Sequence, residues 1–348
     1  MWLKKITLFN FRNFKNKSFL FNPFLTIIIG ENAKGKTNLL EAIHCLTMGK
    51  GFREHKESEL IFFGEKKAKV EGIFEEKDQK FIYETIIEKK NKEIRKIYFI
   101  DYSKKNFFQF KKEIAKVVLF SPDQLEIITG SPEKRRDYFD RFISENDQEY
   151  KKKLNNYQNA LKKRNKLLEK YEKNNNNFFE ELSFWNNYLI EQSKYLFKKR
   201  YHYCQFLNQH FSLDRKEFFI DYQPSLINKD KFKEIFKEEI KYRRTLVGPQ
   251  KDNFFIFFKK DKEKNIHLFG SRSEQRLALF WLKINEINFY EENFKIRPIL
   301  LLDDIFSELD FNNRSLILRL IKNYQSILTT TEIEVVKMEE GVRSLIKI

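Results

Sequence analysis

The chain has 348 residues, of which 41% are hydrophobic and 34% charged, and its formal net charge is +17. This is the composition of a globular protein with a substantial core, and no apolar run reaches the roughly 18 to 20 residues that a membrane-spanning helix needs. The N-terminal residues lack a secretory signal and the two cysteines lie far apart, so we expect a cytoplasmic protein with reduced thiols and no membrane partner. The excess positive charge favours a polyanionic partner such as nucleic acid, with a lysine-rich codon bias as the competing explanation.

The first predicted elements are a strand, a glycine turn and a helix. Residues 24–29 form a continuous apolar run that suits a strand buried on both faces, and Gly30 ends it. A helix pattern follows at once over residues 36–46, with apolar side chains on one face. From Lys67 to about Phe120 the apolar period falls to two, which predicts antiparallel strands with one solvated face.

The middle of the chain predicts a helical hairpin. Apolar residues recur at heptad-like spacing over residues 150–171 and again over 178–196, and four asparagines at 174–177 separate the two runs. Two amphipathic helices joined by a polar tip form an antiparallel hairpin.

The last third returns to strand and helix patterns, with a second buried strand at 295–302 and a helix at 316–321. We therefore expect an α/β head built from both ends of the chain, residues 1–130 and 245–348. The helical arm, residues 131–244, is inserted into it.

Residues 30–37 fit the phosphate-binding pattern G-x-x-x-x-G-K-[ST]. In such a loop the glycines let backbone N–H groups face an anion, and the following helix directs the positive end of its dipole at the same point. Lys36 would neutralise the β- and γ-phosphates of ATP, and Thr37 would offer its hydroxyl to Mg²⁺. The alternative is an ordinary strand–helix turn. We interpret the loop as an ATP site formed by Gly30, Glu31, Asn32, Ala33, Lys34, Gly35, Lys36 and Thr37.

The second buried strand ends in two aspartates, Asp303 and Asp304, and the segment SELD at 307–310 follows. Asp303 would hold Mg²⁺ through water, and Asp304 would orient or deprotonate the water that attacks the phosphate. Acids at a strand end are a weak signal alone, but they complement a phosphate loop elsewhere in the chain. We interpret Lys36 and Asp304 as catalytic, and Thr37 with Asp303 as the metal ligands.

The order of these motifs resembles that of ABC-type ATPase heads, which include transporters, SMC proteins and RecF. The polar segment Gly270–Arg276, ahead of a helix pattern, stands where such heads carry a serine-led signature loop. The chain is similar to the RecF family in particular over residues 30–43, 51–53, 120–125, 130–136, 247–252, 302–310 and 329–331. The resemblance implies a P-loop ABC-type ATPase head, with a mixed sheet, an antiparallel β subdomain and a short helical-hairpin arm.

The resemblance also implies how the site works. Two subunits would dimerise on ATP, so that Ser271 of one meets the γ-phosphate held by the other. Arg12 would reach the phosphates or the base, with an ordinary surface arginine as the equal alternative. Gln124 would belong to a loop that senses Mg²⁺ and the γ-phosphate.

The function implied by the resemblance is recombinational repair. The protein would bind duplex DNA at single-strand gaps and act with RecR and RecO to load recombinase. Weak ATP hydrolysis would control the binding of DNA. Basic clusters would contact DNA phosphates without reading sequence, although each is alternatively a solvated helix face. The clusters are residues 134–136, 151–153, 162–164, 198–200 and 241–244.

The chain departs from the family pattern at Ser273, where the signature loop usually has glycine, and at Gln250, where histidine or arginine is usual. Ser273 motivates one alternative, a DNA-binding structural protein with a degenerate ATP site. A second alternative is an ABC transporter ATPase subunit. A transporter would carry a switch histidine near Thr329–Thr331, and no histidine follows His267.

Overall fold

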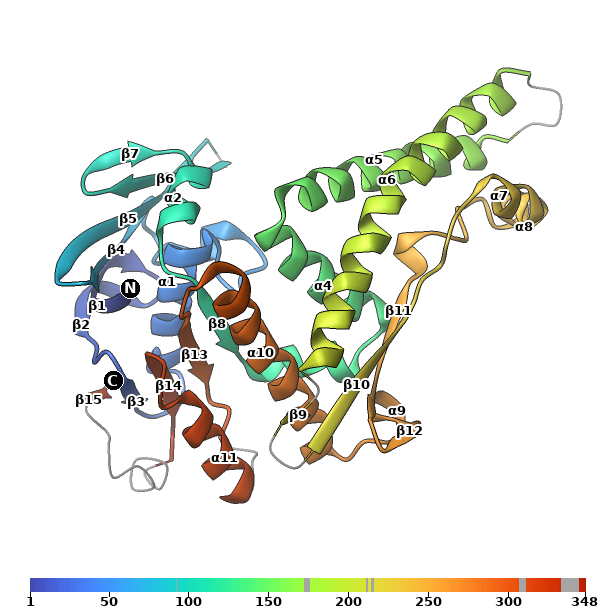
Figure 1. Cartoon of the computed structure of the whole chain (residues 1–348). Coiled ribbons are helices and arrows are strands. Elements are labelled where there is room, and N and C mark those ends of the chain that lie inside the picture. The colour runs from blue at the N-terminus through green and yellow to red at the C-terminus, as the bar shows by residue number, and fades with distance from the viewer. Residues whose placement is uncertain (92, 172–175, 211, 214–215, 307–310, 333–343) are drawn as a thin grey trace. The chain divides into compact units, whose positions relative to one another are not determined.

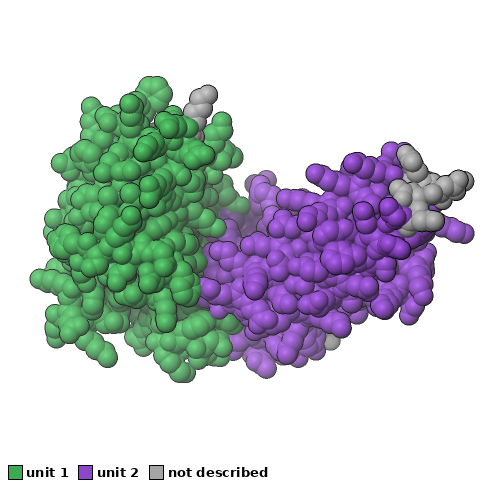
Figure 2. Space-filling view, turned by 90° about the horizontal axis from the view of Figure 1, so that it is seen from above, with its two compact units in different colours: residues 1–123, 283–348 green, residues 124–282 purple. Residues whose placement is uncertain are grey.

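The computed structural model of the chain describes residues 1–348 apart from 92, 172–175, 211, 214–215, 307–310 and 333–343 (Figure 1). The chain divides into two units, residues 1–123 with 283–348 and residues 124–282, which Figure 2 colours separately. No helix among the described residues is both long and apolar enough to cross a membrane. The lobe limits expected from the sequence, near residues 130 and 245, stay a prediction.

An antiparallel sheet forms one half of the first unit. Burial alternates along its strands, as in the pattern of β4, because one face packs inward while the other is solvated. Helix α1 (Lys36–Met48) contacts this sheet at Gly72, where a Cβ atom would come within 2.5 Å of the Leu46 side chain. The strand order is β2 (Phe14–Leu20), β1 (Trp2–Phe11), β4 (Lys67–Glu76), β5 (Gln79–Lys90), β6 (Glu93–Ile100) and β7 (Ser103–Lys105).

A parallel five-stranded sheet forms the other half of the first unit. Its inner strands are buried along most of their length, which explains their continuous apolar sequences. Parallel pairing brings the carboxyl ends of these strands to one edge, where the phosphate loop and the acidic strand end both lie. The order is β15 (Ser344–Lys347), β3 (Leu25–Ile29), β14 (Ser326–Thr330), β13 (Ile299–Asp303) and β8 (Val117–Phe120).

Strand β8 corrects one expectation. The sequence placed residues up to about 120 among antiparallel strands, but helix α2 (Phe107–Glu113) ends that run, and β8 pairs in parallel with β13. All four residues of β8 are buried, so the strand has no wet face and lacks the alternation of its predecessors. The expected helix near the C-terminus is present within α11 (Phe311–Ile321).

The second unit contains the predicted helical hairpin, formed by α5 (Gln148–Glu169) and α6 (Asn176–Gln209), which pack against each other. Of the four asparagines expected at its tip, 174 and 175 lie outside the described residues and the next two begin α6. Helix α4 (Pro132–Asn146) precedes the hairpin. An antiparallel sheet of β12 (Asp261–Asn265), β11 (Asn253–Phe258), β10 (Lys216–Gln223) and β9 (Ser212–Leu213) completes the unit, with α3 (Glu126–Thr129), α7 (Lys229–Glu234), α8 (Phe236–Tyr242) and α9 (Ile266–Phe269).

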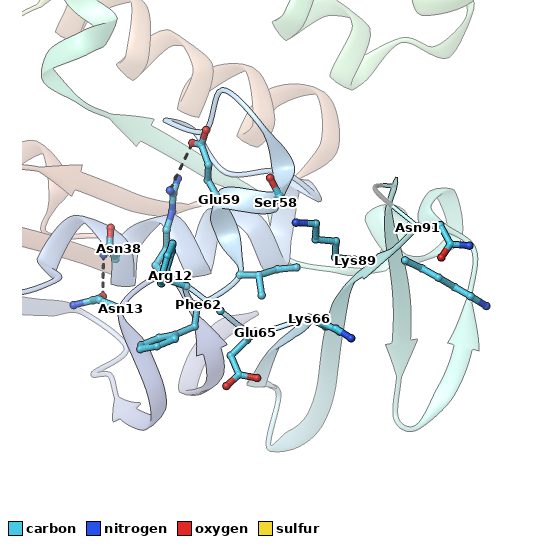
Figure 3. Close-up of a pocket in the computed structure, with 14 residues that line it drawn as sticks. Arg12, Asn13, Asn38, Ser58, Glu59, Phe62, Glu65, Lys66, Lys89 and Asn91 are labelled. Carbon is cyan, nitrogen blue, oxygen red and sulfur yellow. Dashed lines mark hydrogen bonds and ion pairs between the residues drawn. The ribbon is translucent and has the colours of Figure 1, made fainter.

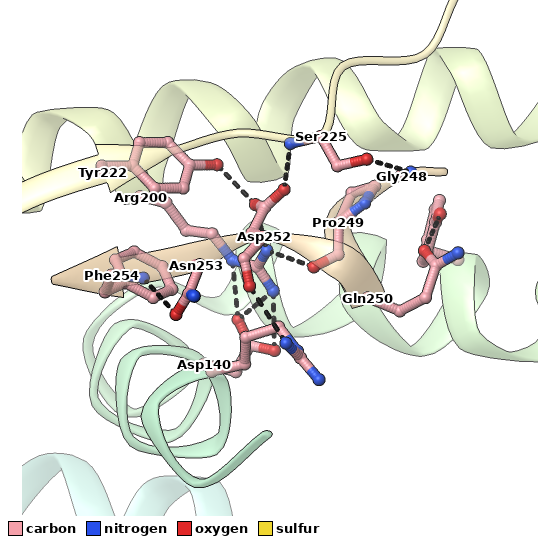
Figure 4. Close-up of polar contacts among 12 residues, drawn as sticks. Asp140, Arg200, Tyr222, Ser225, Gly248, Pro249, Gln250, Asp252, Asn253 and Phe254 are labelled. Atoms are coloured by element: carbon pink, nitrogen blue, oxygen red, sulfur yellow. Dashed lines mark hydrogen bonds and ion pairs between the residues drawn. The ribbon is translucent and has the colours of Figure 1, made fainter. Parts of the chain in front are cut away.

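A buried polar network holds the hairpin to this sheet (Figure 4). Arg200 of α6 is 1% exposed and binds both carboxylate oxygens of Asp140 on α4, at 2.7 and 2.9 Å from Nη2. It also binds Asp252, which accepts from the Tyr222 hydroxyl at 2.6 Å. Burial raises the pKa of Asp252, while the Arg200 charge and the Tyr222 hydrogen bond oppose that rise. Because a buried ion pair is costly to break, this network fixes the helices to the loop ahead of β11.

Candidate nucleotide site

The phosphate loop connects β3 to α1 and is shaped by a glycine. Gly35 has φ of +113°, and a Cβ atom there would lie 2.6 Å from the Asn13 amide and 2.9 Å from the Phe14 ring. Neither the conformation nor the space admits a side chain. No side chain caps the start of α1, and its first turn has no acidic residue. The first-turn N–H groups therefore remain available to an anion, with the helix dipole in support.

Lys36 lies across this loop. Its side chain is largely buried, and its ammonium donates to the carbonyl oxygens of Gly30 at 2.7 Å and Glu31 at 2.9 Å. The charge is thus held at the mouth of the loop rather than extended into solvent.

Asp303 meets the loop from the opposite end of the sequence. The Thr37 hydroxyl donates to Asp303 Oδ1 at 2.9 Å, across 266 positions of sequence, and the Thr329 hydroxyl donates to the same oxygen at 2.8 Å. Burial raises the pKa of Asp303, and the hydrogen bonds from Thr329 and Thr37 oppose that rise. The structure thus brings together the two residues that the sequence predicted as metal ligands. A hydroxyl and a carboxylate oxygen are the hard ligands that Mg²⁺ prefers.

Thr329 is a site residue whose contacts the sequence did not predict. It pairs in register with Asp303 across β14 and β13, and its hydroxyl also accepts the N–H of Asp304 at 3.0 Å. Asp304 has φ of +47° and is half-buried. Thr329 reaches Asp303 only through the register of β14 with β13. Nothing in the local sequence of residues 329–331 therefore indicated this contact. The SELD segment, 307–310, lies outside the described residues.

Arg12 lies beside the loop but is not an exposed surface arginine. Its guanidinium donates to both carboxylate oxygens of Glu41 on α1, at 2.7 and 2.8 Å, and Glu41 has no exposed side-chain surface. Arg53 donates its backbone N–H to the same carboxylate at 3.2 Å. Whether Arg12 also reaches a nucleotide stays a prediction.

A groove of about 1030 Å³ opens next to the loop (Figure 3). At one end Asn13 donates to the Lys34 carbonyl oxygen at 3.1 Å and accepts from Asn38 at 2.8 Å, which ties the groove to the phosphate loop. Figure 3 shows Lys66, Lys89 and Asn91 at the other end. The remaining lining residues are Arg12, Ser58, Glu59, Ile61, Phe62, Phe63, Gly64, Glu65 and Lys90.

Ser271 and Gln124 belong to the second unit. Ser271 precedes α10 (Arg272–Phe294) and forms a capping box with Glu274: its N–H donates to the carboxylate at 2.8 Å, and its hydroxyl accepts the Glu274 N–H at 3.3 Å. Burial raises the pKa of Glu274. The hydrogen bonds from Ser271 and the Lys264 ammonium outweigh this effect and hold that pKa below its usual range. Gln124 lies in a short 3₁₀ turn, Pro122–Leu125. Their contact with a nucleotide stays a prediction.

The basic clusters are only partly available to DNA. Three arginines expected there are buried: Arg135 binds Asn253 and the Gly130 carbonyl oxygen, Arg164 binds Glu239, and Arg200 belongs to the network described above. Their role in phosphate contact is therefore corrected, because a guanidinium with almost no exposed surface, already bonded inside the protein, cannot reach DNA. The exposed cations of these clusters include Lys151, Lys152, Lys162, Lys163 and Lys198.

Known proteins place the chain in a family. The RecF/RecN/SMC N terminal domain family matches residues 2–347. DNA replication and repair protein RecF of Bacillus mycoides (strain KBAB4) is 33% identical over 360 residues, covering 97% of this chain and 94% of that protein. The RecF protein of Bacillus cereus (strain G9842) is 32% identical over the same shares.

Solved structures agree. The recombination mediator protein RecF-ATPrS in the RecFOR pathway matches with a TM-score of 0.84 and 30% identity, covering 100% of this chain and 96% of that chain. An Smc head domain with a coiled coil and joint from Pyrococcus yayanosii matches with a TM-score of 0.57 and 15% identity, a likeness of fold alone. With a phosphate loop and an acidic strand end joined through Thr37 and Asp303, this chain belongs to the RecF family of DNA replication and repair proteins.

Proposed function

We propose that the chain binds ATP and Mg²⁺ at residues 30–37 and hydrolyses ATP slowly between two copies of itself. The cycle would hold DNA at single-strand gaps during recombinational repair. The hydrogen bond between Thr37 and Asp303 carries this proposal, because it joins the phosphate loop to the acid that such a site requires. The solved RecF-ATPrS structure supports the choice of nucleotide.

The residues of the loop and of the acidic strand end would each have a separate role in ATP binding and hydrolysis. The first-turn N–H groups of α1 would bind phosphate oxygens, and the Lys36 ammonium would turn from the Gly30 and Glu31 carbonyl oxygens to the β- and γ-phosphates. Thr37 and Asp303 would hold Mg²⁺, which supplies positive charge beside the phosphates. Asp304, fixed by its backbone bonds to Thr329, would orient the attacking water.

The nucleoside would lie in the groove at its Asn13 and Asn38 end. Asn38 follows Thr37 directly on α1, and Asn13 is bonded to the phosphate loop, so this end adjoins the phosphates. Phe62 and Arg12 also line the groove and offer a ring face and a planar cation to a base.

We infer the dimer and the partners from the family resemblance. Ser271 of one copy would face the γ-phosphate bound by the other. Exposed lysines of the arm would contact DNA phosphates without base readout. We expect RecR and RecO as partners in loading recombinase, and the cytoplasm as the place of action.

One alternative keeps a specific observation in its favour. Ser273 occupies the position where the signature loop usually has glycine, so the chain would be a DNA-binding structural protein if this side chain prevents the second copy from closing on ATP. The transporter alternative is set aside by the family.

Sedimentation with gapped DNA, with and without ATP and Mg²⁺, tests the proposal. The wild-type chain should dimerise and retain DNA only with both, whereas Lys36→Arg or Asp303→Asn should abolish the ATP-dependent part. Lys104→Arg is the matched control, since Lys104 is an exposed cation of the same unit outside the loop. ATP-dependent retention of DNA that is unchanged in the Lys36 and Asp303 variants would contradict the mechanism. ATP binding without dimerisation or turnover would favour the structural alternative.

A further inference from the structure

The end of the groove that points away from the phosphate loop has its own chemistry. Phe63 is 97% exposed, which makes it the most exposed of the large hydrophobic side chains in the described part of the chain. Lys66, Lys89 and Lys90 are exposed beside it. Within the described residues none of these three lysines forms an ion pair, whereas the neighbouring Lys67 pairs with Glu88 at 3.2 Å. One carboxylate, Glu65, lies among them and offsets part of this charge.

The turn that presents Phe63 is held by backbone hydrogen bonds. The Glu65 N–H donates to the Phe62 carbonyl oxygen at 3.0 Å, and Gly64 has φ of +86°, which only glycine adopts easily at that position of a turn. The Phe62 N–H is in turn bonded to the Asn10 carbonyl oxygen at 2.8 Å. The backbone therefore presents the Phe63 ring to solvent, and only the side-chain torsions of Phe63 need to be fixed when a ligand binds.

A backbone hydrogen bond joins the two segments that carry these lysines. The Lys89 N–H donates to the Lys66 carbonyl oxygen at 2.8 Å, so the end of β5 and the segment before β4 are joined. Figure 3 shows Lys66, just before β4, and Lys89, on β5, at the far side of the groove from Asn13. An aromatic face beside several unpaired ammonium groups suits a ligand that alternates flat rings with negative charges.

We propose that this end of the groove, defined by Phe63, Lys66, Lys89 and Lys90, binds a single strand of DNA. Phe63 stacks on an unpaired base while the lysines contact the adjoining phosphates. A duplex fits less well, because its base faces are already stacked and are closed to the ring. The inference rests on the proposed function and deepens it, since it assigns the single-stranded part of a gap to a surface beside the nucleotide.

The test uses the full chain with ATP and Mg²⁺, and three fluorescent probes: a gapped duplex with an oligo-dT gap, the free oligo-dT strand and a blunt duplex. Phe63→Ala should weaken binding of the gapped and single-stranded probes by about fivefold to a hundredfold, the loss expected from one aromatic–base stack. Affinity for the blunt duplex should stay within about twofold. Lys89→Gln with Lys90→Gln should lower the slope of log K against log salt by about 1.4 on the single strand, at about 0.7 per phosphate contact.

Matched controls come from the same unit. Phe108 is 54% exposed on α2, and Lys104 and Lys112 are exposed, so Phe108→Ala and the double change Lys104→Gln, Lys112→Gln should leave all three affinities unchanged. Unchanged binding of single strands by Phe63→Ala, or an equal loss on the blunt duplex, overturns the inference while leaving ATP-dependent DNA retention intact. A wild-type chain that fails to retain gapped DNA overturns the proposed function instead.

Discussion

Thr329 connects two consecutive residues of the acidic strand end. Its hydroxyl donates to Asp303 Oδ1 at 2.8 Å and accepts the Asp304 N–H at 3.0 Å. Asp304 holds a left-handed backbone conformation, φ +47°, which a non-glycine residue adopts only when its surroundings enforce it. One threonine therefore fixes both the metal-binding carboxylate and the direction of the acid beside it.

Replacing Thr329 with valine keeps the shape of the side chain and removes both hydrogen bonds. We expect Thr329→Val to lower the free energy of unfolding by about 1–3 kcal/mol, because Asp303 and the Asp304 N–H each lose a buried partner. ATP turnover should fall about tenfold or more while KM changes little, since the acid is displaced but the phosphate loop is not. Urea unfolding and steady-state hydrolysis measure the two effects, and Thr329→Ser should restore both. A valine variant as stable and active as wild type would contradict this role.

Residue by residue, the sequence predicted what a local pattern can specify. Lys36 and Thr37 follow from the spacing of the phosphate loop, and Asp303 from the end of an apolar run. The contact of Thr329 with Asp303 depends on the register of two strands, and the pairing of Arg12 with Glu41 depends on a turn packing against a helix. Neither relation is visible in one dimension, because both join segments that are distant in sequence.

At the scale of elements, arginines hold the arm together. Arg164 of α5 donates to Asn186 of α6 at 2.7 Å and to Glu239 of α8 at 2.6 Å, and neither Arg164 nor Glu239 has exposed side-chain surface. Sequence alone could not separate this arginine from its exposed neighbours Lys162 and Lys163, because a basic run looks the same whether its members face solvent or an acid. In β8 a similar ambiguity arises, since four apolar residues do not reveal which sheet they join.

The change Arg164→Met distinguishes a structural role of this arginine, in holding the helices of the arm together, from a role in DNA contact. It leaves Glu239 buried without its cation. We therefore expect the free energy of unfolding of the second unit to fall by about 3–5 kcal/mol. At temperatures where the variant is folded, DNA affinity and its salt dependence should match wild type. Lys162→Gln is the control and should change stability by no more than about 0.5 kcal/mol. Weaker DNA binding by folded Arg164→Met, with a smaller salt slope, would restore the arginine to the DNA interface.

At the scale of the whole molecule, the two ends of the chain form one parallel sheet, with β15 and β14 on either side of β3. The sequence predicted one α/β head built from both ends of the chain, because two strand-and-helix segments flank the helical arm. The proposed ATP-driven dimerisation would add a demand that one chain cannot meet, because the segment before α10 would have to close on a phosphate held by a second copy. Ser271, which forms a capping box with Glu274, and the first-turn N–H groups of α10 would be the donors for that contact.

Ser273 is the second residue of α10, where a Cβ atom limits how closely a phosphate approaches the backbone. We expect Ser273→Gly to strengthen dimerisation in a non-hydrolysable ATP analogue about tenfold, the equivalent of one hydrogen bond to a charged group at about 1.4 kcal/mol. The glycine costs the helix at most about 1 kcal/mol, and it acts equally on monomer and dimer. Ser273→Ala is the discriminating control, because it removes the hydroxyl but keeps the Cβ atom and should dimerise like wild type. Sedimentation across a range of protein concentrations gives the dimer constant for each variant. If Ser273→Gly dimerises no more readily than wild type, the side chain at this position is no obstacle, and the signature loop of this chain closes on ATP without the glycine usual in its family.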